Sequence, residues 1–420
     1  MMWRVDDGRV AEICAELRRD ALHNLSLGGK ELFHSDFLAW FAQSYPEEAA
    51  HVFSGYAQLG DPGPGEVAER EYEHLDLILR LPHLQLIVIE NKVWSLPDDA
   101  QLQAYAAGPI SRLGTDKTQC GPLGGRGDGP AQILLSLTPP GWDQPGTRVL
   151  GDTARWDYLS YQELADRLEP VAERLGKSAS ADDRFAGQLV QRYAAWVKLL
   201  CRLAGEVTVA PSEPVLLDDR SRAALERARI HDGISKLRGR RVMAALLEQL
   251  RAEDPSVEAI APGSEEADAF QPQARWQLLR LQRRVAGLEV SFSRGMPLLS
   301  GAVAMDSGDR LFWQYQNGQW RLIVITAHHR GSTPGAIARR HAYVADRYSK
   351  WFDFQAVEDL LGPARGRQVQ VKGDKGFQRF NPDSAYRYAK VDQGGLRITV
   401  SELIQLGIHY LNRAASWSAG

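Results

Sequence analysis

The stretch HLDLILRLPHLQLIVIENKVWSLPDDAQLQAY, residues 74–105, decides the fold of the first half of the chain. It contains two apolar runs of β-strand type, residues 75–81 and residues 84–93. Only Pro82 and His83 separate the two runs. Because so short a connection leaves no room for a crossover, the pattern predicts an antiparallel hairpin.

Both runs carry charged residues that the interior of a strand does not explain. Asp76 lies near the start of the first run, and Glu90 and Lys92 lie near the end of the second. Alternation along a strand puts Glu90 and Lys92 on the same face. With the tip of the hairpin at His83, Asp76 lies opposite Glu90, so two carboxylates and one ammonium group meet at one point. A slip of one residue would turn Asp76 to the other face.

Helical segments are expected on both sides of the hairpin. Upstream, KELFHSDFLAWFAQS begins near Lys30 and carries Glu31 in its first turn. Downstream, the Pro97-Asp98-Asp99 cluster is typical of a helix start. In the helix that follows it, Gln101 and Tyr105 are four residues apart and share one face.

These residue types suit the hydrolysis of a phosphodiester bond. That reaction needs a metal ion that polarises the phosphate and an activated water molecule, and Mg²⁺ or Mn²⁺ takes hard oxygen ligands. Asp76 and Glu90 supply two such ligands, and the backbone carbonyl group of Asn91 supplies a third. Lys92 is placed to orient or deprotonate the attacking water.

The order and spacing of these residues resemble those of the PD-(D/E)XK nuclease superfamily. The matching pattern is Asp76, then Glu90-Asn91-Lys92 about fourteen residues later inside an apolar strand. Leu75 stands where the signature of the superfamily has a proline. That proline is a dispensable part of the signature.

Three flanking segments extend the resemblance. Gln101 and Tyr105 resemble the Q-x-x-x-Y element of the RecB-like branch, which there helps to hold the active site and the bound DNA. The segment ELFHSDFLAW resembles the first helix of that branch, so Glu31 matches an acidic residue that can join the metal site. Residues 156–168, WDYLSYQELADRL, resemble the helix after the last core strand.

The resemblance implies a restriction-endonuclease-like core, in which a small mixed sheet lies between helices. It also implies a Mg²⁺-dependent nuclease, with DNA as the common substrate. A two-domain cytoplasmic nuclease of this kind resembles a restriction or anti-phage defence effector. The alternative is a catalytically silent protein that keeps the nuclease fold as a nucleic-acid-binding or assembly module.

A structural explanation of the charged residues also exists. Asp76 and Glu90 can be carboxylates at a strand edge, with Lys92 as a salt-bridge partner. However, residues 87–89 are Ile, Val and Ile, which indicates a buried strand. A buried carboxylate needs a partner or a metal ion, so the joint pattern favours a functional site.

Length and composition favour a two-domain globular protein. The chain has 420 residues, 44% hydrophobic and 25% charged, which is too long for one ordinary core. We expect a catalytic domain over residues 1–205, a linker and basic helix over 206–265, and an α+β domain rich in antiparallel strands over 266–420. The last domain is expected to bind substrate, to sense a signal or to form a homo-oligomer.

Charge is distributed unevenly along the chain. Residues 1–205 carry a net charge of about −9 and residues 206–420 about +6, which sum to the −3 of the whole chain. In the second half, residues 365–397 are basic and interleaved with aromatic residues, a pattern that suits phosphate contact and base stacking. A solvated edge of a sheet is the alternative. The candidate nucleic-acid-binding residues there are Arg365, Arg367, Lys372, Lys375 and Arg379.

Two further signals in the second half predict local structure. Asn317-Gly318 between two aromatic-rich runs predicts a tight β-hairpin. Thr399 and Glu402 have the spacing of a capping box at the start of a terminal helix.

Cysteine usage and hydropathy exclude other classes of protein. The three cysteines are odd in number and widely spaced, which fits neither a disulfide framework nor a zinc site. No apolar run approaches 18 residues, and the N-terminus has no hydrophobic signal segment. We therefore expect a cytoplasmic protein with no membrane partner.

Overall fold

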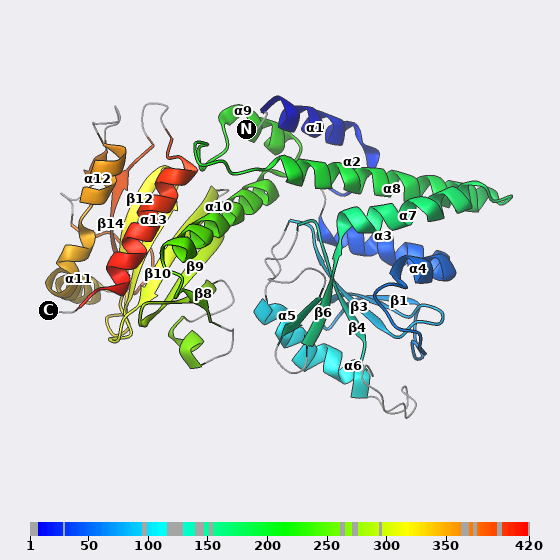
Figure 1. Ribbon diagram of the computed structural model, residues 1–420, viewed down its shortest axis with the longest axis horizontal. Coiled ribbons are helices and arrows are strands. Elements are labelled where there is room, and N and C mark those ends of the chain that lie inside the picture. The colour runs from blue at the N-terminus through cyan, green and yellow to red at the C-terminus, as the bar shows by residue number, and fades with distance from the viewer. Residues whose placement is uncertain are drawn as a thin grey trace. The chain divides into compact units, whose positions relative to one another are not determined.

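The computed structural model divides the chain into two compact units (Figure 1). The N-terminal unit comprises residues 7–207 with 220–234, and the C-terminal unit comprises residues 208–219 with 235–418. The structure describes residues 7–27, 30–94, 99–115, 129–138, 147–150, 154–260, 265–270, 276–293, 296–362, 369–372, 376–392 and 397–418.

A mixed six-stranded sheet forms the centre of the N-terminal unit, with the strand order β1-β2-β3-β4-β6-β5. Strand β2 is antiparallel to both β1 and β3, β4 and β6 run parallel to β3, and β5 is antiparallel to β6. The strands are β1 (Ala68–Tyr72), β2 (Leu75–Leu79), β3 (Ile87–Lys92), β4 (Ala131–Ser136), β5 (Thr147–Leu150) and β6 (Ala154–Ser160).

Helices pack on this sheet. Leu102, Ala106 and Ile110 contact the face that carries Ile78 and Val88. Helix α3 contacts β1, β2 and β3, and α7 contacts β6. The helical elements are α1 (Asp7–Arg19), α2 (Ala21–Leu25), α3 (Glu31–Ser44), α4 (Pro46–Phe53), α5 (Asp99–Tyr105), the π-helical turn η1 (Ala106–Ile110), α6 (Ser111–Thr115), α7 (Tyr161–Gly176), α8 (Ala181–Glu206) and α9 (Asp219–Arg227). The unit is therefore a mixed α/β structure, as the sequence predicted.

The β2–β3 hairpin has the predicted register. Leu77 lies opposite Ile89, and Leu79 lies opposite Ile87. Continued by one residue, this register places Asp76 opposite Glu90. The connection turns at His83, whose φ is +62°.

Helix α7 continues through Pro170, from Tyr161 to Gly176, although a proline inside a helix usually interrupts it. Pro170 is exposed, so its ring meets solvent and not a neighbouring element. Ser160 caps the start of the helix, because its hydroxyl accepts a hydrogen bond from Glu163 N at 3.0 Å.

An antiparallel eight-stranded sheet forms the centre of the C-terminal unit, with the strand order β13-β14-β12-β11-β10-β9-β8-β7. Its strands are β7 (Glu258–Ala259), β8 (Trp276–Leu281), β9 (Arg284–Ser293), β10 (Met296–Ala304), β11 (Arg310–Gln316), β12 (Gln319–Ile325), β13 (Gln370–Lys372) and β14 (Ser384–Lys390). Its helical elements are α10 (His231–Glu253), which begins in the N-terminal unit, η2 (Glu265–Ala269), α11 (Pro334–Tyr348), η4 (Ser349–Phe352), α12 (Gln355–Leu361) and α13 (Val400–Ala415).

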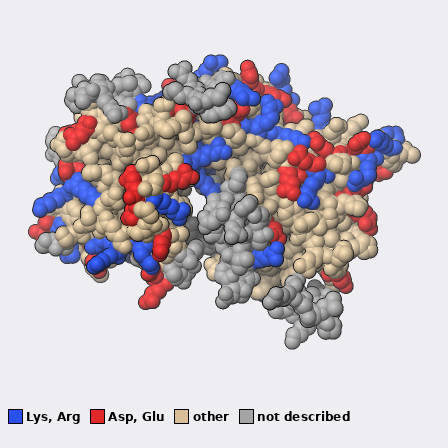
Figure 2. Space-filling model, viewed as in Figure 1, with Lys and Arg blue, Asp and Glu red and all other residues tan. Residues whose placement is uncertain are grey.

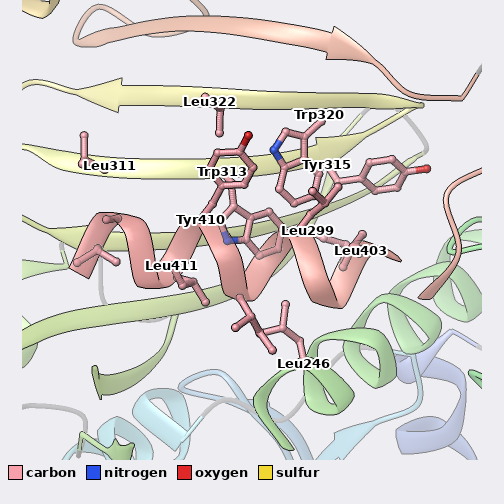
Figure 3. Packing of buried hydrophobic residues seen from close by; sticks show 14 of the residues in the cluster. Leu246, Leu299, Leu311, Trp313, Tyr315, Trp320, Leu322, Leu403, Tyr410 and Leu411 are labelled. Carbon is pink, nitrogen blue, oxygen red and sulfur yellow. The ribbon is translucent and has the colours of Figure 1, made fainter. Parts of the chain in front are cut away.

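One face of this sheet, the inner face, packs against helices in the main core. Leu246 of α10 and Leu403 and Tyr410 of α13 belong to this core (Figure 3). Trp313 and Trp320 stack there with their ring centroids 4.9 Å apart. Large aromatic side chains therefore supply much of the buried area of the unit.

Two local predictions in this unit are confirmed. Strands β11 and β12 pair up to Gln316 and Gln319, so Asn317 and Gly318 form the turn between them. Both turn residues have positive φ, +49° and +69°, as a type I′ turn requires. The capping box at Thr399 is formed with both of its hydrogen bonds.

The basic helix expected within 206–265 is broken into two. These are α9 and α10, separated near Arg229, where φ is +60°. The segment 334–361 is divided into α11, η4 and α12. The expected linker over 206–265 also differs, because α10 places Val242 and Leu250 in the core of the C-terminal unit.

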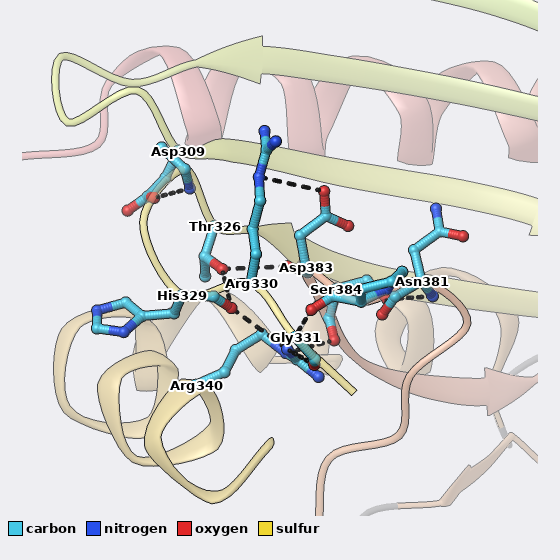
Figure 4. A network of polar contacts seen from close by, with 11 residues as sticks. Asp309, Thr326, His329, Arg330, Gly331, Arg340, Asn381, Asp383 and Ser384 are labelled. Carbon is cyan, nitrogen blue, oxygen red and sulfur yellow. Dashed lines mark hydrogen bonds and ion pairs between the residues drawn. The ribbon is translucent and has the colours of Figure 1, made fainter. Parts of the chain in front are cut away.

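A buried arginine fixes one end of the C-terminal sheet (Figure 4). Arg340 of α11 is fully buried, and its Nε donates to the carbonyl oxygen of Ser384 at 3.0 Å. Its Nη1 donates to the carbonyl oxygens of His329 and Gly331 at 3.2 and 3.1 Å, and also to that of Pro382. Arg340 thus ties the segment after β12 to the start of β14.

Candidate active site on the β2–β3 hairpin

The charged residues of the hairpin lie together on one buried face. Asp76, Glu90 and Lys92 alternate with the same parity as Ile78 and Val88, so they face the side that α5 covers. Glu90 is 1% exposed and Lys92 is 9% exposed. Lys92 Nζ and Glu90 Oε1 form an ion pair at 2.6 Å.

The second oxygen of Glu90 has no hydrogen-bond donor among the residues that the structure describes. Its carboxyl group lies within hydrogen-bonding reach of that of Asp76. Asp76 Oδ2 accepts a hydrogen bond from Asn91 N at 2.7 Å. Since two carboxylates cannot donate to each other, the space between them suits a shared proton or a cation.

Burial raises the pKa of both carboxyl groups. The pKa of Glu90 rises to about 8, because burial and the charge of Asp76 outweigh the attraction of Lys92. The pKa of Asp76 is also raised by burial, against the hydrogen bond from Asn91 N and the charge of Lys92. Buried carboxyl groups with raised pKa values are typical of functional sites.

Lys92 is a cation at neutral pH. Burial by itself would lower its pKa, but the carboxylates of Glu90, Glu31 and Asp76 outweigh burial and raise it. A lysine with a raised pKa is a poor base. Of the two roles expected for Lys92, orienting water or phosphate therefore suits this geometry better than deprotonating water.

Asn91 links the hairpin to two helices on the opposite face of the sheet. Its Nδ2 donates to the carbonyl oxygen of Glu31 at 2.8 Å and to Ser35 Oγ at 3.2 Å. The hydroxyl group of Tyr161 donates to Asn91 Oδ1. The side chain of Asn91 therefore connects β3 to both α3 and α7. The backbone N–H of the same residue binds Asp76.

Sequence reasoning did not single out Tyr161. It is the first residue of α7, directly after Ser160 at the end of β6. A tyrosine at the junction between a strand and the following helix is the sequence signal that can identify Tyr161. Its partner Asn91 is 70 residues away in the sequence, so no local pattern reports the pair.

Glu31 reaches the site from α3, as its place in the sequence predicted. Its Oε1 accepts a hydrogen bond from Val93 N at 3.0 Å, just beyond Lys92. Its charge raises the pKa of both Asp76 and Lys92, which shows that it is close to them. At least one of its oxygens binds backbone, so a role as metal ligand stays a prediction.

Gln101 and Tyr105 of α5 also approach the hairpin. Gln101 Nε2 donates to the hydroxyl oxygen of Tyr105 at 2.6 Å. The pKa of Tyr105 is raised by burial and then by the charge of Glu90. The pair thus lies on the face of the sheet that carries Asp76 and Glu90.

A Mg²⁺ ion fits this set of donors in one particular way. Within the described part of the chain, no three His, Cys, Asp or Glu side chains form a metal-holding group. Mg²⁺ commonly uses one or two carboxylates and completes its coordination with water and substrate phosphate oxygens. Asp76 and Glu90, with an oxygen of Glu90 that lacks a donor, match that mode.

His34 lies behind the site in an aromatic environment. Its Nδ1 is 2.9 Å from the hydroxyl oxygen of Tyr193, and its ring stacks on Trp196 with centroids 4.8 Å apart. Burial lowers its pKa to about 3, so it is neutral at physiological pH. It packs the helices together and is remote from proton-transfer chemistry.

The candidate nucleic-acid-binding residues lie in the C-terminal unit. Lys372 is the last residue of β13 and is half-buried, and Arg379 is exposed. The other three candidates, Arg365, Arg367 and Lys375, lie outside the described residues.

Surface charge is mixed on the face drawn in Figure 2, where Lys and Arg lie beside Asp and Glu over most of the molecule. On that face, the acidic and the basic half of the chain do not form one acidic and one basic surface. On this face, charge alone therefore assigns no surface to nucleic acid.

No family model, no curated protein and no solved structure matches this chain. Among the described residues, no helix is both long enough and apolar enough to cross a membrane.

Proposed function

We propose that this chain is a divalent-metal-dependent nuclease of the PD-(D/E)XK type, with its active site on the β2–β3 hairpin. One observation carries the proposal. Two carboxyl groups, Asp76 and Glu90, meet on a buried strand pair beside Lys92, and an oxygen of Glu90 has no donor among the described residues. The mixed sheet between helices agrees with the restriction-endonuclease-like core that the sequence resembles.

The residues have distinct roles in this proposal. Asp76 and Glu90 hold the cation, which polarises the phosphate and activates water when it is bound. The Lys92 ammonium group orients the water or the phosphate and neutralises charge in the transition state. Gln101 and Tyr105 lie beside the carboxylates and position substrate.

DNA is the proposed substrate, because it is the common substrate of the superfamily that the chain resembles. The same resemblance supports a cytoplasmic restriction or anti-phage defence effector. In this proposal, the C-terminal unit captures substrate or joins copies of the chain.

A catalytically silent protein is the second candidate, and the Glu90–Lys92 ion pair favours it. At 2.6 Å this pair is complete without a metal ion. The described residues also contain no group of three metal-binding side chains. In this case, the hairpin would hold the fold together and the protein would bind nucleic acid without cutting it.

Cleavage assays separate the two candidates. Supercoiled plasmid, linear duplex, single-stranded DNA and RNA are incubated with the protein and Mg²⁺ or Mn²⁺. We expect cleavage that falls at least about a thousandfold in Asp76→Asn, Glu90→Gln and Lys92→Ala, since each removes a group that acts only in the transition state or holds the cation.

The chain offers a matched control for these variants. Glu173 and Lys177 form an ion pair of 2.5 Å on the surface of the same unit, where they are 69% and 73% exposed. Glu173→Gln and Lys177→Ala make the same chemical changes and should leave cleavage unaltered. If the wild type cuts none of the substrates with either metal ion, the proposal of a nuclease fails.

A further inference from the structure

The eight-stranded sheet of the C-terminal unit has a second face, the outer face, opposite the main core. Residues of β11, β12 and β14 alternate, so Trp313, Trp320 and Ala389 point into the core and their neighbours point outward. At one end of the outer face, Phe312 and Ile323 belong to a small apolar cluster. Tyr386 packs against this cluster, and beyond it the outward residues of β11 to β14 are polar.

The polar part of the outer face is basic and contains no acidic side chain on the described strands β11 to β14. The pairing aligns five residues of five strands in one row across the sheet. This row is Lys372, Tyr388, Arg321, Gln314 and Ser300, and it continues onto β9 at Glu289. The neighbouring row continues the same chemistry with Gln370, Lys390, Gln319 and Gln316.

Arg321 is held flat on this face by glutamine side chains. Its Nη1 donates to Gln314 Oε1 at 2.7 Å and to Gln316 Oε1 at 3.2 Å. Its Nη2 donates to Gln319 Oε1 at 2.9 Å. Amide oxygens orient the guanidinium group without neutralising it, so its positive charge stays available to an anion.

Aromatic rings lie beside this arginine. The guanidinium carbon of Arg321 is 5.8 Å from the ring centroid of Tyr386. The ring of Tyr386 is 6.4 Å from that of Tyr388 and 5.6 Å from that of Phe380. Phe380 is 49% exposed, and Arg379 beside it is exposed as well.

We propose that the outer face of β12, β13 and β14, with Phe380, binds a single strand of nucleic acid. The rings of Tyr386, Tyr388 and Phe380 stack on bases, and the cationic groups of Arg321 and Lys372 contact phosphates. Stacking of this kind requires unpaired bases, because the faces of paired bases are covered in a duplex. On the described strands β11 to β14 this face carries no acidic side chain, which favours a polyanion over a protein partner there, and Glu289 of β9 lies at the far end of the row.

This inference goes beyond the proposed active site, because it concerns a different unit and a binding activity that needs no metal ion. Its relation to cleavage rests on the proposed function. Its test uses binding in EDTA, so a failure of binding and a failure of cleavage are told apart.

The test measures fluorescence anisotropy of labelled oligonucleotides with the full-length chain. Oligothymidylate of about 20 nucleotides is compared with a duplex of equal length, since that length exceeds the site of one small sheet domain. We expect the single strand to bind at least about tenfold more tightly than the duplex. Affinity should fall steeply as salt concentration rises.

Variants identify the surface. Tyr388→Ala should weaken single-strand binding about tenfold or more by removing a stacking partner. Arg321→Gln should weaken it similarly, and Lys372→Ala should reduce the slope of the salt dependence by about one. Arg321→Lys keeps the charge and should restore part of the affinity, which checks against a loss of folding.

Arg280 supplies the matched control. It lies on β8 and forms a two-point ion pair with Glu266 at 2.6 and 2.7 Å, so its charge is already neutralised. Arg280→Gln should leave binding unchanged, and so should Glu173→Gln on the surface of the other unit. Equal affinity for single strand and duplex, or unaltered binding by Tyr388→Ala, would overturn the inference. So would self-association of the chain that Tyr388→Ala abolishes, because the face would then be an interface between copies.

Discussion

The two sheets of this protein place charged side chains in different environments. In the C-terminal unit, Arg321 and Lys372 alternate with core residues and lie on the outer face. In the N-terminal unit, Glu90 and Lys92 lie on a buried face under a helix. Alternation leaves the first set half-buried, although burial lowers the pKa of Arg321, whereas the nearly complete burial of the second set costs free energy that needs a compensating role.

This difference in burial indicates which charged residues of a sheet belong to a functional site. Glu90 keeps a raised pKa and an oxygen without a donor among the described residues, so its site is electrostatically strained in the absence of a cation. The core around Trp313 and Trp320 is built from close packing of apolar groups and carries no ionised side chain among them, although both indole Nε1 atoms also lack an acceptor among the described residues. Substitutions in the two regions should therefore change different properties.

The largest effect on stability is expected in the C-terminal core. Trp320 is fully buried and stacked on Trp313, so Trp320→Ala should lower the free energy of unfolding by about 3–5 kcal/mol. Gln319→Ala, one residue earlier on the outer face, should change it by no more than about 0.5 kcal/mol. Guanidinium unfolding of both variants checks this. Similar losses in the two would show that the two faces of this sheet do not differ as described.

Glu90→Gln should stabilise the metal-free protein at high pH. The folded-state pKa of Glu90 is raised from 4.5 to about 8, so its contribution to stability is complete below pH 4.5 and is lost as the pH rises through about 8. The amide cannot ionise. At pH 8 the variant should be more stable than the wild type by roughly 1–3 kcal/mol, a range that allows for the lost attraction to Lys92.

Thermal unfolding in EDTA between pH 4.5 and 8 measures this difference. The gap between Glu90→Gln and the wild type should close as the pH approaches 4.5. Glu173→Gln on the surface should show no such trend. A variant that is less stable than the wild type at pH 8 would mean that Glu90 serves as a structural ion-pair partner and not as a strained site.

A smaller effect is expected from the link behind the hairpin. Tyr161→Phe leaves Asn91 Oδ1 without its phenol donor and should lower the free energy of unfolding by about 1–2 kcal/mol. Because Asn91 N holds Asp76, cleavage should fall about tenfold as well. Tyr193→Phe removes a comparable buried bond to His34 and should lower stability without slowing cleavage. Equal rates in both variants would remove Tyr161 from the positioning of the site.

Local signals allowed parts of this structure to be predicted from sequence. The short connection between Leu79 and Ile87, centred on His83, sets the register that places Asp76 opposite Glu90. The Asn317-Gly318 turn and the capping box at Thr399 are equally local. In each case the residues that form the feature are close in sequence, so chain geometry alone specifies it.

Features that depend on distant contacts could not be predicted in this way. The link from Tyr161 to Asn91 exists only because β6 and β3 both pair with β4. The break in the helix at Arg229 and the continuity of α7 through Pro170 depend on packing and exposure that no local window contains. The sequence therefore predicted the charged residues of the candidate site together with Gln101 and Tyr105, and it missed Tyr161, which supports the site from α7.

Binding of Mn²⁺ to the hairpin tests the central claim most directly. Calorimetric titration of the full chain with Mn²⁺, in the presence of an oligonucleotide whose phosphorothioate linkages resist cleavage, should show about one site per chain. Asp76→Asn and Glu90→Gln should each weaken that binding at least about tenfold, whereas Glu173→Gln should not change it. Absence of binding by the wild type, or binding that neither hairpin variant weakens, would contradict the assignment of Asp76 and Glu90 as a cation site.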